Sequence, residues 1–296
     1  MPKRDSTESR LRAAIFASPG DDAPRLVYAD WLLERGDPRG EFIQIQCRLG
    51  RPVGGSGKLS PNHPMMRSKH PTLDAASKKA LEVREQALLR AHQKSWIAPI
   101  RKYINSWFWE RGFVSRVDVN VSKLITHFAA ILEFAPLRAV YLMGSTPALL
   151  RRLSETALVS SIPWLSIDMQ RIGAREAEIF RSPHFARLQQ LSLQLNPLGD
   201  EAVNVLASST TLGALRSLDL SFSQVDITSQ GIERLSCAAF FPNLTELVLD
   251  CSLARKTAIA PILKRGVRLK SLSLGSHTLT KEEAKLRTRR GLAEPT

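Results

Sequence analysis

The sequence predicts an α/β solenoid, a series of strand–helix pieces whose strands form one parallel sheet. Two observations support this prediction. A pattern of three apolar residues, at its first, fourth and sixth positions, recurs seven times, and successive copies begin 23 to 29 residues apart. Stretches with helical apolar spacing lie between the copies. The copies begin at Val114, Leu137, Ile162, Leu188, Leu215, Leu244 and Leu269.

A period of 20 to 29 residues with this apolar spacing is typical of leucine-rich repeats. Each such repeat buries its apolar face against its neighbours, so a stack of repeats forms a continuous core. We therefore expect about seven repeats over residues 113–280. They should form a horseshoe, with a parallel sheet on the concave face and helices on the convex face.

Helices are expected between the strands. One repeat, Leu193–Val203, resembles the ribonuclease-inhibitor class of leucine-rich repeat. In that class an asparagine, here Asn196, turns the chain out of the strand, and a full helix follows. Serine or histidine stands at this position in other repeats, so their turns should be less regular. The expected helices cover residues 121–134, 147–158, 175–180, 201–207, 231–239 and 257–264.

The first fifty residues predict three short helices. Pro24 suits the first turn of the second helix, and Gly36 suits the position just past its end. Asp37, followed by a proline, is expected to cap the third helix through its side chain. The helices should cover residues 9–17, 21–35 and 37–49.

The run Val27–Ile43 (Val-Tyr-Ala-Asp-Trp-Leu-Leu-Glu-Arg-Gly-Asp-Pro-Arg-Gly-Glu-Phe-Ile) closely resembles the bacterial repeat-companion domain. That family is a small helical module that commonly precedes leucine-rich repeats. The match covers about residues 9–49. It implies a small all-α domain over residues 1–50 and implies little about activity, because the family has no assigned biochemical function.

Three further segments complete the expected organisation. Residues 51–72, rich in glycine and proline, predict a linker. Residues 73–112, with a helix over 73–93 and an aromatic cluster around Trp96, Trp107 and Trp109, predict a cap over the solenoid core rather than a platform for ligand stacking. Residues 281–296 predict a basic C-terminal tail.

The net charge of +14 is concentrated in two stretches, residues 51–102 and 254–296. Each holds eleven Lys or Arg against three Asp or Glu, and the rest of the chain is near neutral. Such stretches occur in solvated helices and tails, and they also attract nucleic acid. The alternative function is therefore a nucleic-acid-binding protein. Its contacts would be Lys58, Arg67, Lys69, Lys78, Lys79, Lys285, Arg287, Arg289 and Arg290.

The residues between the apolar positions of each strand should line the concave face. This lining has several carboxylates and an aromatic patch, which favour a cationic or amphipathic protein surface as partner. The alternative for this face is a merely solvated surface with Trp164 packed against a neighbouring strand. We therefore expect a non-enzymatic protein-interaction module or scaffold. The expected binding residues are Tyr141, Met143, Trp164, Asp168, Gln194, Asp219, Glu246 and Asp250.

The motifs that would indicate catalysis are missing from the sequence. Gly54–Lys58 departs from a phosphate-binding loop, because Pro52 stands where a glycine is needed and Leu59 replaces Ser or Thr. The six histidines lack metal-ligand spacing. We expect no cofactor, no metal and no small-molecule substrate. The densest acidic group is Asp30, Glu34, Asp37 and Glu41, which caps and ion pairs (Glu34 with Arg35, Glu41 with Arg39) explain better than acid–base chemistry.

The location expected from the sequence is cytoplasmic. Its apolar stretches are shorter than the roughly 20 residues that a membrane span requires. No apolar run follows the charged first residues, which argues against a secretory signal. Cys47, Cys237 and Cys251 are odd in number and scattered, as expected of reduced, buried thiols.

Overall fold

The computed structural model describes residues 6–54, 73–223, 225, 227–249, 259–265 and 268–273. The chain divides into two compact units. The N-terminal unit comprises residues 1–119 and 127–138, and the C-terminal unit comprises residues 120–126 and 139–296. The segments expected as linker and basic tail lie almost entirely outside the described residues, and the expected domain boundaries stay predictions.

The N-terminal unit begins with the three expected helices, α1 (Ser6–Ala17), α2 (Ala23–Leu33) and α3 (Pro38–Leu49). Their ends follow the predicted signals. The Asp37 carboxylate accepts a hydrogen bond of 2.8 Å from the backbone N–H of Arg39 at the start of α3. Gly36 and Gly50 follow α2 and α3 with φ of 69° and 61°, in the left-handed region that glycine adopts at little cost.

Helix α4 (Ala75–Arg101) is longer than predicted, since the sequence indicated an end near residue 93. Pro99 lies in the last turn of the helix. Ile97 and Ile100 are buried, and they continue the apolar stripe of Leu89 beyond the predicted end. Burial of this stripe offsets the cost of proline near a helix end.

Strands β1 (Val53–Gly54), β2 (Ser106–Glu110) and β3 (Phe113–Asn120) pair antiparallel within the N-terminal unit. Arg111 and Gly112 join β2 to β3 with φ of 52° and 79°, as in the tight turns that suit a hairpin twist. A side chain at Gly112 would meet Ile43 of α3 at 2.2 Å, so only glycine fits there. The first predicted repeat strand is thus also the second strand of a hairpin.

The aromatic residues of the predicted cap pack inside the N-terminal unit. Phe42 of α3 lies 5.0 Å from Trp96 of α4 and 5.7 Å from Trp109 of β2, measured between ring centroids. Trp109 is fully buried. These rings join α3, α4 and β2 into one core, and their role as a cap on the repeats stays a prediction.

The C-terminal unit contains a parallel sheet in chain order. Its strands are β4 (Ala139–Met143), β5 (Trp164–Ser166), β6 (Gln190–Ser192), β7 (Ser217–Leu220), β8 (Glu246–Leu249) and β9 (Ser271–Ser273). The fourth position of each apolar pattern forms a buried row in register across the sheet. This row is Val140, Leu165, Leu191, Leu218, Leu247 and Leu272. The repeat pattern thus predicted both strands and register.

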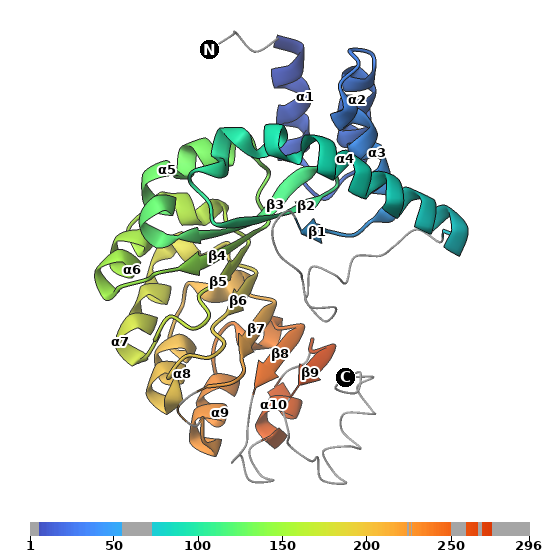
Figure 1. The fold of residues 1–296 in the computed structure, drawn as a ribbon. Coiled ribbons are helices and arrows are strands. Elements are labelled where there is room, and N and C mark those ends of the chain that lie inside the picture. Colours follow the sequence, from blue (N-terminus) through green and yellow to red (C-terminus); the bar gives the residue numbers. More distant parts are fainter. Residues whose placement is uncertain are drawn as a thin grey trace. The chain divides into compact units, whose positions relative to one another are not determined.

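Most of the helical segments between these strands are shorter than predicted, and their lengths vary. Helix α5 (Val121–Phe134) matches its prediction and contributes residues to both units. Helices α6 (Pro147–Ser154), α7 (Ala174–Ala177), α8 (Gly199–Ala207) and α9 (Ser229–Ser236) follow one another along one side of the sheet (Figure 1). Helix α10 (Ile259–Arg265) packs against α9.

Short 3₁₀ helices take the place of full α-turns in several repeats, at Ala157–Ser161, Glu178–Arg181, Pro183–Phe185, Leu212–Ala214 and Phe241–Asn243. A repeat of 25 or 26 residues leaves few residues for the return, and the tighter 3₁₀ helix suits short pieces. In the repeat of Asn196, the one that resembles the ribonuclease-inhibitor class, the expected helix is α8, with nine residues.

None of the described helices is both long and apolar enough to cross a membrane. Cys47 is buried, and burial raises the pKa of its thiol to about 12. Cys237 is exposed, contrary to the expectation of buried thiols, because it follows the last turn of α9 on the outer surface. Cys251 lies outside the described residues. The cytoplasmic location stays a prediction.

Candidate functional site

The residues that alternate with the buried leucines form one face of the C-terminal sheet, which we call the polar sheet face. Trp164 is in register with Gln190, Ser217 and Glu246. Asp219 lies two residues after Ser217 on β7. Because side chains alternate along a strand, Trp164 and Asp219 share this face, as the sequence analysis requires.

The aromatic patch is present but packed. The rings of Tyr141 and Trp164 lie 5.8 Å apart between centroids and are tilted by 58°. Only 8% of Trp164 is exposed, whereas Met143, at the end of β4, is 44% exposed. Trp164 therefore packs against the neighbouring strand, the alternative noted for this residue, and Met143 is the accessible member of the patch.

Asp168 organises the turns that follow β5 and β6. Its two carboxylate oxygens accept hydrogen bonds of 2.6 Å from the hydroxyls of Ser166 and Ser192. The backbone N–H of Gln194 donates to the same carboxylate at 2.9 Å. This carboxylate holds two adjacent repeats together, so part of its hydrogen-bonding capacity is used within the chain.

Asp219 of β7 has a similar role at the ends of β6 and β7. It accepts hydrogen bonds from the backbone N–H of Ser221 at 2.9 Å, from the Ser221 hydroxyl at 2.6 Å and from the side-chain amide of Gln194. Burial raises the pKa of Asp219, and the charge of Asp168 adds to the rise while the hydrogen bonds oppose it. Gln194 thus links the two carboxylate sites.

Glu246 and Asp250 complete the predicted site residues. Glu246 accepts a hydrogen bond of 2.9 Å from the Ser217 hydroxyl on the adjacent strand. Asp250 lies outside the described residues. None of the residues of β4–β9 is Lys or Arg, so the described charges of this face are acidic.

The structure adds a feature that sequence reasoning missed. Met169, Leu195 and Phe222 stand two residues after the third apolar position of three successive repeats. All three adopt left-handed backbone conformations, with φ of 57°, 57° and 54°. Hydrogen bonds from Met169 N to Gln194 O and from Leu195 N to Ser221 O join successive turns. We call these three residues the apolar ridge.

The side chains of the apolar ridge are exposed, by 68% for Met169, 37% for Leu195 and 59% for Phe222. A left-handed conformation costs roughly 1–2 kcal/mol for a residue other than glycine. Gly144, with φ of 60°, holds the equivalent position after β4 at no such cost. The signal in the sequence was a large apolar residue at a turn position in three consecutive repeats.

The four acidic residues noted in the N-terminal unit each have a separate structural partner. Asp37 caps α3, Asp30 accepts a hydrogen bond of 2.8 Å from Gln44, and Glu34 lies 3.8 Å from Arg35. Glu41 forms two contacts of 2.6 Å with Arg84 of α4, so the pair predicted with Arg39 is wrong. The described residues contain no group of three or more His, Cys, Asp or Glu placed to hold a metal ion.

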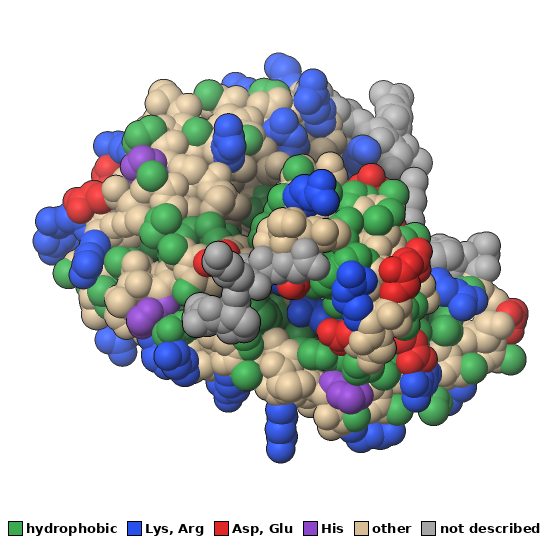
Figure 2. All heavy atoms as spheres, turned by 90° about the horizontal axis from the view of Figure 1, so that it is seen from above, with side chains coloured by type: hydrophobic (Ala, Val, Ile, Leu, Met, Phe, Trp, Pro, Cys, Tyr) green, Lys and Arg blue, Asp and Glu red, His purple; other side chains and the backbone are tan. Residues whose placement is uncertain are grey.

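The basic residues of the alternative function are described only in part. Lys78 and Lys79 are exposed in the first turns of α4. The other seven, Lys58, Arg67, Lys69, Lys285, Arg287, Arg289 and Arg290, lie outside the described residues. On the face shown in Figure 2, the described Lys and Arg side chains are spread among other types rather than gathered in one patch. The nucleic-acid alternative stays a prediction.

The chain is similar to solved structures but matches no family model and no curated protein. An internalin from Listeria monocytogenes is similar in structure, with 17% sequence identity and a TM-score of 0.35 over 55% of this chain and 42% of the internalin. The tropomodulin C-terminal domain from Caenorhabditis elegans has 16% identity and a TM-score of 0.37 over 67% of this chain and 98% of that domain.

This chain therefore spans less than half the length of the internalin. Both TM-scores lie below 0.5, so neither structure bears on the function of this chain.

Proposed function

We propose that this protein is a non-enzymatic protein-interaction module, a leucine-rich-repeat horseshoe that binds a protein partner through its C-terminal unit. The contact surface combines the polar sheet face with the apolar ridge beside it. The residues proposed from the sequence remain part of this surface, with Met143 more accessible than Trp164. The apolar ridge is the observation that supports the proposal most strongly.

Two properties of the apolar ridge favour binding. Large apolar side chains at neighbouring exposed positions mark protein-interaction sites more often than single exposed ones do. The ridge residues are also held in left-handed conformations that cost free energy, and such strain is found mainly where function requires it. A surface turn without a binding role would be expected to carry Gly or Asn at these positions, as the turn after β4 does with Gly144.

The chemistry of the partner follows from the two parts of the surface. The apolar ridge requires apolar side chains opposite Met169 and Phe222. The adjacent face supplies carboxylates from Asp168, Asp219 and Glu246, without Lys or Arg among the strand residues of β4–β9. An amphipathic segment with apolar residues on one side and Lys or Arg on the other complements both parts.

The test begins by capturing a partner from host extract with the tagged full-length chain and then measuring its binding as a purified protein. Replacing both Met169 and Phe222 with serine should weaken that binding by about tenfold or more, because exposed aromatic and methionine anchors dominate such contacts. Val83→Ser is the matched control, since Val83 is an equally exposed apolar residue on α4 of the other unit.

Equal affinity for the double variant and the wild type would rule out the apolar ridge as the contact. A second outcome also contradicts the proposal: concentration-dependent self-association that Phe222→Ser abolishes would mean that another copy of this chain occupies the ridge. Folding is checked by circular dichroism. Removing exposed side chains leaves the buried leucine row intact, so the fold should be retained.

The charge on the polar sheet face is tested separately. Glu246→Lys should lower the association rate of a cationic partner and reduce its dependence on salt, because like charges then face each other. Glu201→Lys is the control, since Glu201 is an exposed residue of α8 rather than of a strand. The same rate for Glu246→Lys and wild type would exclude the face from the contact.

A further inference from the structure

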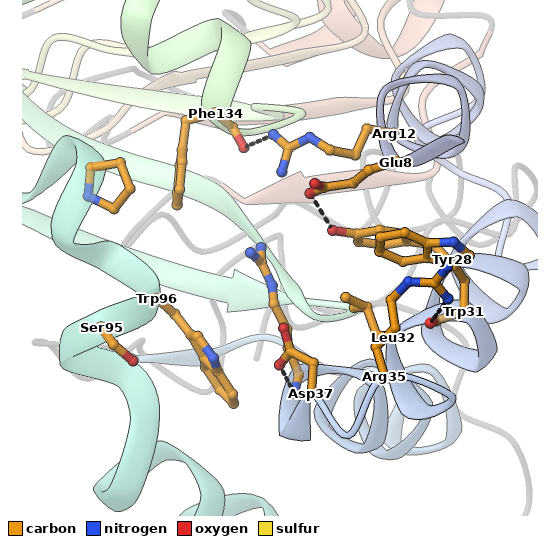
Figure 3. Close-up of a pocket in the computed structure, with 12 residues that line it drawn as sticks. Glu8, Arg12, Tyr28, Trp31, Leu32, Arg35, Asp37, Ser95, Trp96 and Phe134 are labelled. Carbon is orange, nitrogen blue, oxygen red and sulfur yellow. Dashed lines mark hydrogen bonds between the residues drawn. The ribbon is translucent and has the colours of Figure 1, made fainter. Parts of the chain in front are cut away.

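The N-terminal unit contains a pocket of about 470 Å³, a volume within the range of small-molecule sites. Helices α1, α2 and α4, the start of α3 and the end of α5 contribute its lining (Figure 3). The Val27–Ile43 segment supplies much of the wall, with Tyr28, Trp31, Leu32, Arg35, Asp37 and Arg39. No motif in the sequence predicts a ligand for this segment.

Arg39 is the unusual member of this lining. Its side chain is about nine-tenths buried, and its Nε and Nη2 atoms have no hydrogen-bond partner among the described residues. Burying a guanidinium without a hydrogen-bonded partner is costly. The ring of Phe113, centred 5.1 Å from the guanidinium carbon, compensates for part of this cost. Among the described residues, these two nitrogen atoms of Arg39 therefore lack a hydrogen-bond acceptor.

The other arginines of the pocket differ from Arg39, because their donors are used within the chain. Arg12 donates to the backbone carbonyl of Phe134 at 2.9 Å (Figure 3). It also donates to the backbone carbonyl of Glu133 at 3.0 Å. Arg35 donates to the Trp31 carbonyl at 3.1 Å and stacks on the Trp31 ring at 4.0 Å.

The two carboxylates of the pocket also have structural partners. Glu8 accepts a hydrogen bond of 3.0 Å from the Tyr28 hydroxyl, and Asp37 caps α3 (Figure 3). Burial lowers the pKa of Arg39, and the nearby charge of Arg12 lowers it further. Neither carboxylate hydrogen-bonds to the Arg39 guanidinium, so its charge lacks a paired acceptor among the described residues.

Aromatic rings form the apolar part of the pocket. Trp31 of α2 and Trp96 of α4 both line it, and Trp31 stacks on Tyr28 with 5.9 Å between ring centroids. A buried, unpaired cation beside aromatic walls matches a ligand that carries an oxyanion on a flat apolar body. Carboxylates and phosphate monoesters share this chemistry.

We propose that the pocket of the N-terminal unit binds a small aromatic oxyanion, whose carboxylate or phosphate pairs with Arg39 and whose ring packs against Trp31 and Trp96. This proposal is independent of the partner proposed for the C-terminal unit. It gives the repeat-companion-like segment a binding role, in which the Tyr-Ala-Asp-Trp and Asp-Pro-Arg runs supply the wall and the cation.

The experiment titrates the full-length protein with benzoate, phenyl phosphate, inorganic phosphate and the uncharged benzyl alcohol by calorimetry. Benzoate or phenyl phosphate should bind with one-to-one stoichiometry and a dissociation constant of about 1 mM or tighter. Inorganic phosphate should bind more weakly, because it lacks the ring, and benzyl alcohol should not bind. Arg39→Gln should weaken the tighter anion by about ten- to a hundredfold.

Arg48→Gln is the matched control, since Arg48 is an exposed arginine of the same helix, and it should leave the affinity unchanged. If Arg39→Gln does not fold, the proposal is tested by NMR on the wild-type protein. The Nε–H signal of Arg39 should then shift on addition of phenyl phosphate. Absence of saturable binding by either aromatic anion, an unmoved Arg39 signal, or equal weakening by both variants would overturn the proposal.

Discussion

The two units bury different kinds of polar side chain. The buried polar residues of the N-terminal unit are mostly charged: Arg12, Arg25, Arg39, Gln46, Glu85, Glu110, Ser115 and Arg116. Those of the C-terminal unit, within the described residues, are neutral: Ser154, Ser166, Ser192, Asn196, Ser209, Ser221 and Ser236. This difference in charge follows from the repeated structure of the C-terminal unit.

In a stack of repeats, a side chain faces the equivalent side chain of the next strand at about 5 Å. A charge in a repeated position therefore meets a like charge, which is destabilising. The positions equivalent to Asp219 on the two preceding strands are Ser192 and Ser166, and even the more distant charge of Asp168 adds to burial in raising the pKa of Asp219. Ser and Asn donate and accept hydrogen bonds without this repulsion. The helices of the N-terminal unit do not repeat, so a buried charge there can have its own partner, as Glu85 does in Arg51.

Among the tests of this difference between the units, Asn196→Ala in the C-terminal unit should have the largest effect on stability. The fully buried Asn196 side chain accepts from the backbone N–H groups of Gln170 and Ile172 and donates to the carbonyls of Ile167 and Leu193, at 2.8 to 3.0 Å. Alanine leaves those groups buried without partners. We expect the free energy of unfolding to fall by about 3–5 kcal/mol, measured by urea denaturation.

Asn204→Ala controls for the loss of an amide, because Asn204 is exposed on α8 and only receives a hydrogen bond from Arg234. A loss for Asn196→Ala no larger than for this control would show that water replaces the buried amide, and that neutral hydrogen bonds do not hold the repeats together.

The next test concerns a buried charge of the N-terminal unit. Glu85 is fully buried and accepts hydrogen bonds from Arg51 at 2.9 Å and from Gln46 at 3.1 Å. Arg51→Met leaves the carboxylate without its counter-charge. The variant should lose about 2–4 kcal/mol of unfolding free energy at pH 7. Glu85→Gln should lose less, since it removes the charge together with the need for a partner.

The pH dependence of the unfolding free energy tests whether the loss in Arg51→Met comes from the charge of Glu85. Burial raises the pKa of Glu85 above its ordinary value, so the folded state binds the proton more tightly than the unfolded state does. Stability then falls as pH rises from about 4 through the folded pKa. The loss of unfolding free energy in Arg51→Met should become smaller toward pH 4, where the Glu85 carboxyl is protonated. A deficit independent of pH would mean that lost packing, not charge, is responsible.

The smallest expected effect is that of Asp219→Asn, which removes a raised pKa from the C-terminal unit. The folded state binds the proton of the Asp219 carboxyl more tightly than the unfolded state does. The free energy of unfolding of the wild type therefore falls as pH rises above about 4. Asparagine can still accept from Ser221. We expect a change of about 1 kcal/mol or less at pH 7 and a flatter dependence of stability on pH, measured by thermal unfolding between pH 4 and 8.

Glu201→Gln removes an exposed carboxylate from the same unit and controls for net charge. A steeper pH dependence in Asp219→Asn than in wild type would contradict a raised pKa for Asp219.

The sequence predicted the repetitive part of the fold well. The strands and their register followed from apolar spacing, because a single residue of slippage would turn every leucine out of the core. Asp37 as a helix cap and Gly36 after α2 followed from local backbone chemistry. Such predictions depend on residues close together in the chain.

The predictions that failed depended on distant residues. The helix over 73–93 was predicted to end near residue 93, but buried Ile97 and Ile100 extend α4 to Arg101. Arg39 was expected to pair with Glu41 at the surface, whereas Glu41 pairs with Arg84 and Arg39 is buried. The sequence left open whether Trp164 is accessible or packed, and in the structure it packs beside Tyr141.

The sequence by itself determined which residues form strands, which side of each strand is apolar, and where the first helices begin and end, because spacing and capping act over a few residues. Only the tertiary structure decided that Met169, Leu195 and Phe222 stand beside one another on exposed turns, and that Arg39 lies in a pocket without an acceptor. Adjacency and burial arise when segments far apart in the chain pack together, and local spacing does not specify which segments meet.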